Sequence, residues 1–226
     1  MIPLRDNIPS RSWPLANVSI IILNTLVFIY ELSLGPYIEK FILHYGFTPA
    51  VYQYLSEIAP ANIPLRVYPI FTSMFMHGGW VHLISNMWIL WIFGDNVEDR
   101  MGHLRYILFY LACGIAAALT QFWVNPYARV PMVGASGAIA GVMGAYFFLY
   151  PHARILTLIP IFFFFQIIEI PAFFFLAFWF IMQFFSGSLA ITTHALAGGV
   201  AWFAHIGGFI TGAALIWLFK KRSRVT

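Results

Sequence analysis

The sequence predicts an all-α polytopic membrane protein, a bundle of six transmembrane helices with both termini in the cytoplasm. Of its 226 residues, 61% are hydrophobic and 9% are charged, whereas a soluble domain carries about 25% charged residues. Apolar stretches recur at the length of about 20 residues that a helix needs to cross a bilayer. Lysines and arginines gather in alternate connections, which sets the orientation of the spans. We therefore expect residues 1–226 to form a single membrane domain.

The first four spans follow from apolar stretches and their stop signals. Span one covers residues 15–34 and ends at Gly35-Pro36. No small-residue cleavage site follows it, so we expect a retained span and not a signal peptide. The connection 37–66 carries apolar residues at helical spacing, which is typical of an amphipathic segment in the membrane interface. Spans two, three and four are predicted at residues 71–93, 104–124 and 133–150.

Residues 155–185 are apolar almost throughout, which is too long for a single span. Pro160, Glu169 and Pro171 interrupt this stretch. We assign residues 171–185 to span five and interpret residues 155–170 as an interfacial segment or a hairpin that leads to it. Span six is predicted at residues 195–219, before a basic C-terminal end.

Six spans place both chain termini on the same side of the membrane. The terminal side then holds nine Lys and Arg residues: Arg5, Arg11, Arg100, Arg105, Arg154, Lys220, Lys221, Arg222 and Arg224. The opposite side holds three: Lys40, Arg66 and Arg129. The positive-inside rule therefore places both termini in the cytoplasm. This predicts a multi-pass integral membrane protein, in the plasma or inner membrane if the source is prokaryotic.

Composition and motifs exclude several classes of function. The basic residues lie at helix ends, so no nucleic-acid-binding patch is expected. Cys113 is the only cysteine, which rules out an intramolecular disulfide. There is no H-E-x-x-H zinc motif and no pair of intramembrane aspartates, so we expect neither a metalloprotease nor an aspartyl protease. We expect no metal and no cofactor, and the lipid bilayer as a partner.

Four polar side chains are predicted to lie at one depth in the membrane. Measured from the cytoplasmic ends of their spans, His82, Ser136 and His205 lie thirteen or fourteen residues in, and Asn86 is one turn deeper than His82. At 1.5 Å per residue this depth is about 20 Å from the inner face. Polar groups inside spans are rare and usually functional. Any one of these side chains taken alone more often has a structural role. Their shared depth on three parallel helices favours a common functional site.

Small residues predict how two of these helices meet. Residues 133–144 are rich in glycine, with Gly137 and Gly141 one turn apart, and Gly208 and Gly212 repeat this spacing on span six. Small residues four positions apart allow helix backbones to approach closely in lipid. We expect these two surfaces to pack together and to bring the neighbouring serine and histidine of the two spans within hydrogen-bond reach.

These parts predict nucleophilic catalysis. A serine hydroxyl is a weak nucleophile until a base takes its proton, and His205 is the expected base for Ser136. The side chains of His82 and Asn86, with the Ser136 backbone N–H, are the expected donors to an oxyanion. No acidic residue lies at this depth, so we predict a Ser136–His205 dyad. His77 is expected only to brace the first loop.

These motifs together resemble the rhomboid family of intramembrane serine proteases. The family's G-x-S-G, A-H-x-x-G and H-x-x-x-N motifs match residues 134–137, 204–208 and 82–86, and Glu98 with Gly102 resembles its E-x-x-x-G. The resemblance implies that Ser136 is the nucleophile and His205 the base. It assigns His82, Asn86 and Gly134 to oxyanion and substrate binding. It also implies transmembrane protein substrates, cut near their outer ends.

One departure from the family and two alternatives accompany this resemblance. The family often carries a Trp-Arg pair before span two, where this chain has Val67-Tyr68-Pro69 with Arg66 displaced. A transporter or channel for a small polar solute is one alternative, although no inverted repeat is evident. A non-catalytic, client-binding relative is the other, although both Ser136 and His205 are present. Span five, with aromatic residues near its outer end, is the hypothetical lateral gate.

Overall fold

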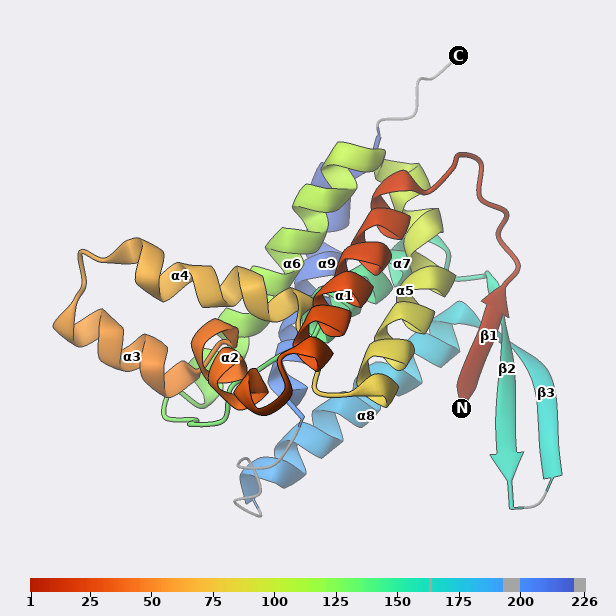
Figure 1. Ribbon diagram of the computed structural model, residues 1–226. Helices are drawn as coiled ribbons and strands as arrows, with labels where there is room; N and C mark the ends of the chain where they lie inside the picture. The colour runs from red at the N-terminus through yellow and green to blue at the C-terminus, as the bar shows by residue number, and fades with distance from the viewer. Residues whose placement is uncertain (163, 193–199, 222–226) are drawn as a thin grey trace.

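The structure, a computed structural model, describes residues 1–162, 164–192 and 200–221 (Figure 1). Within these ranges a helical bundle carries a small sheet on one side and a group of short helices on the other. The elements within residues 1–79 are β1 (Ile2–Asp6), α1 (Leu15–Ser33), η1 (Gly35–Tyr37), α2 (Ile38–Tyr45), α3 (Pro49–Ile58), α4 (Ile63–Thr72) and η2 (Ser73–Phe75). The remainder are α5 (Trp80–Met101), α6 (His103–Val124), α7 (Ser136–Leu149), β2 (Arg154–Ile161), β3 (Phe164–Pro171), α8 (Ala172–Thr192) and α9 (Trp202–Phe219).

Four helices in the described residues are long and apolar enough to cross a membrane, namely α1, α6, α8 and α9. The chain is therefore an integral, multi-pass membrane protein. α5 has 22 residues but carries polar and charged side chains, and α7 is apolar but has only 14 residues. The count of six spans and the side on which the termini lie remain predictions.

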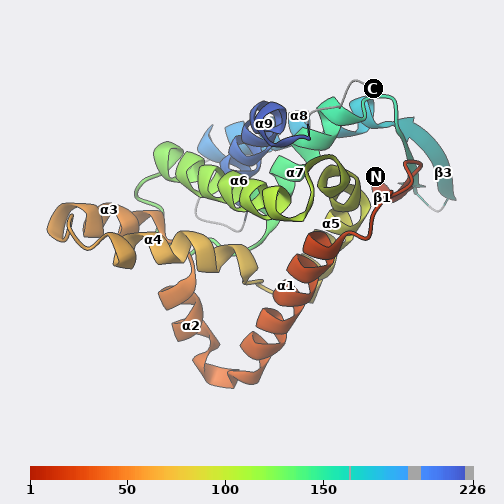
Figure 2. The same cartoon turned by 90° about the horizontal axis from the view of Figure 1, so that it is seen from above.

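Helix α7 lies at the centre of the bundle, between α5, α6 and α9 (Figure 2). Ten of its residues, Gly137 to Tyr146, are buried. A Cβ on Gly208 would collide with the backbone oxygen of Gly137, and one on Gly212 with that of Gly141. The two glycine surfaces therefore pack together as expected, and α7 and α9 run parallel because both contacts advance in the same direction.

Helix α5 begins and ends later than the expected second span. Residues 63–72 form the separate helix α4, and α5 starts after Gly79, whose φ of 158° is an extended conformation. α5 continues through Glu98, which is buried. The Glu98 carboxylate accepts hydrogen bonds from the backbone N–H groups of Ala16 and Asn17 at distances of 2.9 and 2.7 Å, and these bonds offset the cost of its burial. The carboxylate thereby caps the start of α1, whose first N–H groups have no partner within the helix.

A three-stranded antiparallel sheet corrects the all-α prediction. Its strand order is β1-β2-β3, with Ile2 opposite Leu158 and Ile161 opposite Phe164. Within residues 155–170, expected as an interfacial segment or hairpin, residues 155–161 of β2 and 164–170 of β3 pair antiparallel, since isoleucine and phenylalanine favour strands. Pro160 belongs to β2 but lies beyond the residues of β2 that pair with β1, so β3 is its only neighbouring strand. The backbone N–H that proline lacks therefore costs little hydrogen bonding there.

One carboxylate links the sheet to the helices. Asp6 of β1 accepts hydrogen bonds from the Tyr146 hydroxyl of α7 at 2.5 Å and from the Asn96 side-chain amide of α5 at 2.9 Å. Burial raises the pKa of the Asp6 carboxyl, and the hydrogen bond from Tyr146 opposes that rise. The first residues of the chain thus form a strand that is tied to the helices.

The connection between the first two long helices contains three short helices, α2, α3 and α4, on one side of the bundle (Figure 1). The Arg66 guanidinium donates to Ser56 Oγ at 3.2 Å and to the Pro60 carbonyl at 3.0 Å. The displaced arginine therefore ties α3 to α4.

The last two helices differ in length from the expected spans. α8 reaches Thr192, seven residues beyond the predicted end at residue 185. α9 ends at Phe219, the residue at which we expect span six to end. The expected start of span six, at residue 195, lies outside the described residues, as do Arg222 and Arg224.

Candidate active site

Ser136 is the first residue of α7. The chain enters the helix through Gly134, whose φ of 130° is a conformation that L side chains rarely adopt. The Gly134 N–H donates to the Ser73 carbonyl at 2.9 Å, which holds the entry segment against the turn before α5. The Ser136 hydroxyl and backbone N–H therefore lie at the helix N-terminus, where the helix dipole favours negative charge.

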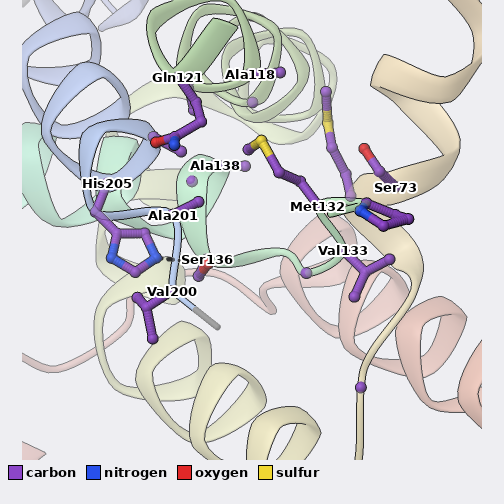
Figure 3. A pocket seen from close by; sticks show the side chains of 18 of the residues that line it. Ser73, Ala118, Gln121, Met132, Val133, Ser136, Ala138, Val200, Ala201 and His205 are labelled. Atoms are coloured by element: carbon purple, nitrogen blue, oxygen red, sulfur yellow. Dashed lines mark hydrogen bonds between the residues drawn. The ribbon is translucent and has the colours of Figure 1, made fainter. Parts of the chain in front are cut away.

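His205 lies in the first turn of α9, opposite Ser136 (Figure 3). Its Nε2 atom is 2.8 Å from Ser136 Oγ. This distance is that of a hydrogen bond between a nucleophile and its base. The close approach of the two glycine surfaces makes it possible, because a side chain at Gly208 would collide with the Gly137 backbone oxygen and push the helices apart.

His82, in the first turn of α5, is held in contact with the segment before Ser136. Its Nδ1 atom accepts the Gly78 backbone N–H at 3.4 Å. A neutral imidazole that accepts at Nδ1 carries its hydrogen on Nε2. A Cβ on Gly134 would lie 2.8 Å from this Nε2 atom. His82 therefore presents an N–H donor beside the serine, and glycine at position 134 leaves space for it.

Asn86 lies one turn further along α5 and is 7% exposed. Within the described part of the chain, its buried Nδ2 atom has no acceptor. A buried amide donor without a partner costs about 1–3 kcal/mol. Asn86 also lines the same cavity as Ser136, so this donor is available to a group that enters there.

One cavity of about 550 Å³ joins all five predicted site residues, His82, Asn86, Gly134, Ser136 and His205. Figure 3 shows the serine and histidine at one side of it and Ser73, Met132 and Gln121 on other sides. Most of its wall residues come from α5, α6, α7, α9 and the segment before α7, with others from α3, α4 and η2. A volume of this size accommodates several residues of an extended peptide.

The first-loop histidine lies as expected outside the Ser136–His205 pair. The His77 backbone N–H donates to the buried Glu31 carboxylate of α1 at 3.1 Å. Its ring meets His82 edge to face, with centroids 5.1 Å apart. His77 thereby ties the turn before α5 to α1.

One residue of the site was not predicted from the sequence. Gln183 of α8 is 8% exposed, and its Oε1 atom is 2.8 Å from His205 Nδ1. The available signal was an amide inside an otherwise apolar stretch, since such groups usually find partners within the membrane. The same helix places Trp179 with its ring centroid 6.0 Å from that of His205.

These residues can together perform acyl transfer. A hydroxyl is paired with an imidazole, and the helix N-terminus, His82 and Asn86 supply donors on the adjoining wall. Preorganised donors of this kind stabilise the charge that develops on a carbonyl oxygen, and loss of one costs about 3 kcal/mol.

Comparison with known proteins agrees with this arrangement. The family model described as "Rhomboid domain" matches residues 64–222. "Rhomboid protein 1, mitochondrial" of Saccharomyces cerevisiae is 31% identical over 156 residues, which cover 67% of this chain and 42% of that protein. "Rhomboid protease GluP" of Bacillus subtilis is 42% identical over 76 residues, which cover 34% of this chain and 14% of that protein. "Rhomboid-like protein 11, chloroplastic" of Arabidopsis thaliana is 34% identical over 119 residues, which cover 53% of this chain and 40% of that protein.

The chain thus spans less than half the length of each of these relatives. The family model, however, includes α5 to α9 and therefore all five predicted site residues. On the family match and the yeast relative together, the chain belongs to the rhomboid family.

Proposed function

We propose that this chain is an intramembrane serine endopeptidase that cleaves transmembrane segments of other membrane proteins. The observation that carries the proposal is the 2.8 Å contact between Ser136 Oγ and His205 Nε2 inside a cavity. Family membership supports it, because rhomboid proteins are generally intramembrane serine proteases. In this proposal Ser136 and His205 are the catalytic residues.

Acylation follows from the geometry of the pair. Ser136 Oγ attacks the carbonyl carbon of the scissile bond while His205 Nε2 takes the hydroxyl proton. Negative charge then moves to the carbonyl oxygen, where His82 Nε2–H, Asn86 Nδ2–H and the Ser136 backbone N–H donate hydrogen bonds. His205 returns the proton to the leaving nitrogen as the carbon–nitrogen bond breaks.

Deacylation uses the same groups with water as the nucleophile. His205 takes a proton from water, the resulting hydroxide attacks the acyl carbon, and the proton passes to Ser136 Oγ as the ester bond breaks. Water must reach the site, and the length of α7 supports this. Its 14 residues are about 21 Å long, so α7 is too short to reach both faces of a core of about 30 Å.

The substrate is expected to enter from the lipid bilayer. A peptide bond within a helix is hydrogen-bonded and covered by side chains, so the segment must unwind locally before attack. α8 is the proposed lateral gate, because Phe184 and Phe185 on this helix are 53% and 64% exposed. Six spans, with α5 and α7 as the two additional ones and both termini cytoplasmic, complete the proposed topology.

Labelling with a fluorophosphonate tests the proposed activity. Ser136 Oγ forms a bond to phosphorus, fluoride leaves, and His205 accepts the proton. The purified protein in detergent is expected to label, whereas Ser136→Ala and His205→Ala are expected not to. Labelling that persists in Ser136→Ala would identify a different nucleophile. A folded wild-type protein that never labels would refute the proposed activity.

A further inference from the structure

We propose that Gln183 is a positioning residue for His205 and that the proposed protease therefore works with a Ser–His–Gln arrangement. This inference rests on the proposed function. The two ring nitrogens of His205 have different partners, each at 2.8 Å: Nε2 contacts Ser136 Oγ and Nδ1 contacts Gln183 Oε1. The imidazole is thus held at both ends.

The glutamine oxygen decides which nitrogen can act as the base. An amide oxygen only accepts, so Nδ1 must be the nitrogen that carries hydrogen. The lone pair of the neutral ring then lies on Nε2 and faces the serine hydroxyl, as proton abstraction requires. With the opposite tautomer, Nε2–H would point at Ser136 and could not take its proton.

Two tryptophan rings lie beside the His205 imidazole. The Trp179 ring centroid lies 6.0 Å from that of His205, and Trp202 meets the imidazole edge-on at 6.3 Å. Trp179 and Gln183 are four residues apart on α8, hence on the same helix face. α8 therefore supplies both an aromatic wall and the acceptor.

A neutral acceptor fits the position in the membrane. A buried carboxylate without a full set of donors lowers folding stability, whereas an amide with one good hydrogen bond does not, although the oxygen of either group can accept the Nδ1 hydrogen. Gln183 fixes the tautomer and orientation of the ring without bringing a charge into the apolar part of the bundle. Its oxygen contacts the ring nitrogen that faces away from Ser136, and Gln183 is not among the described residues that line the cavity, so its role is to position.

The test compares amide, carboxylate and apolar side chains at position 183 in the full chain in detergent. Gln183→Leu and Gln183→Met remove the acceptor, whereas Gln183→Glu keeps it. The fluorophosphonate reaction is measured over a range of probe concentrations to separate the maximal labelling rate from probe affinity. We expect both apolar variants to lower the maximal rate about 10- to 100-fold, as small misplacements of catalytic groups do. Probe affinity should not change, and Gln183→Glu should remain within a few-fold of wild type.

Controls separate the possible failures. Phe174→Leu alters a 63% exposed residue near the start of the same helix, away from Phe184 and Phe185, and should label like wild type. Thermal melting identifies any variant that fails to fold, and the methionine variant preserves length and flexibility if the leucine variant misfolds. Wild-type maximal rates in the folded apolar variants would overturn the role of Gln183 while leaving the protease proposal intact. A Gln183→Glu protein as slow as the apolar variants would also overturn it. Labelling that is absent in wild type or independent of Ser136 would instead overturn the proposed function itself.

Discussion

At the scale of single residues, the site depends on a few atoms whose exact neighbours matter more than their residue type. Ser136, His205 and Asn86 are ordinary polar residues in apolar helices. What distinguishes them is that a hydroxyl meets a ring nitrogen at 2.8 Å and that a buried amide nitrogen faces the cavity without an acceptor among the described residues. Gly134 contributes through the absence of a Cβ, which leaves space for the His82 ring.

Gly134→Ala is expected to lower both activity and stability. Its φ of 130° is unfavourable for alanine, and the new Cβ would lie 2.8 Å from the His82 ring. Strain of this kind costs about 1–3 kcal/mol, and displacement of His82 removes a proposed oxyanion donor. Thermal melting and the fluorophosphonate labelling rate would both report the change.

Gly35→Ala provides the matched control for this substitution. Gly35 also has a positive φ, 51°, but a Cβ there meets nothing within 4 Å. The control should lose about 1 kcal/mol of stability through backbone strain and should label at the wild-type rate. Equal labelling of Gly134→Ala and Gly35→Ala would contradict a specific role for Gly134.

At the scale of elements, the position of α9 against α7 determines whether the catalytic pair exists. The two helices approach so closely that a Cβ on Gly208 or Gly212 of α9 would overlap a backbone oxygen of α7. Backbones pack this closely in lipid only where side chains are small. The serine and the histidine are 69 residues apart in sequence, so their contact depends on this packing and not on local structure.

Gly212→Ala is expected to separate these helices. Its Cβ would overlap the backbone oxygen of Gly141, which cannot move like a flexible side chain. Overpacking of this kind costs about 1–3 kcal/mol, and the Ser136–His205 distance should increase, so that both melting temperature and labelling fall. Ala214→Val, at an exposed position of the same helix, should change neither. Retention of both properties in Gly212→Ala would show that α7 and α9 tolerate a wider separation.

At the scale of the whole molecule, the bundle, the sheet and the short helices are arranged around α7 (Figures 1 and 2). Glu98 of α5 caps α1, and Asp6 of β1 receives hydrogen bonds from α5 and α7. At the other end of the chain, the Lys221 N–H donates to the Arg100 carbonyl at 2.7 Å. Both ends of the described chain are thus fastened to the end of α5, on the side that we predict to be cytoplasmic.

Cysteine accessibility tests this orientation. Cys113, the only native cysteine, is buried, so it should give little background. Ala61→Cys places a thiol in the exposed turn between α3 and α4, and Ser10→Cys places one in the exposed segment before α1. A membrane-impermeant maleimide applied to intact cells should modify the first and should modify the second only after the membrane is opened. The reverse pattern would invert the proposed topology.

Several parts of this protein could be predicted from its sequence because they depend on composition and spacing. Apolar stretches of span length indicate membrane helices whatever their neighbours are. Helix periodicity and a common depth selected His82, Asn86, Ser136 and His205, and all four line one cavity. Small residues at intervals of four indicated which faces of α7 and α9 pack together.

Other parts were decided only by the tertiary structure, because they depend on partners distant in sequence. β1 and β2 pair across about 150 residues, and no local pattern in the polar N-terminus indicates that pairing. Gln183 lies within an apolar helix where its sequence neighbours give no hint of a histidine. The sequence by itself determined that the chain is a membrane protein and which chemical groups its candidate site holds; the tertiary structure decided which ring nitrogen faces the serine, because hydrogen bonds depend on distance and direction in space.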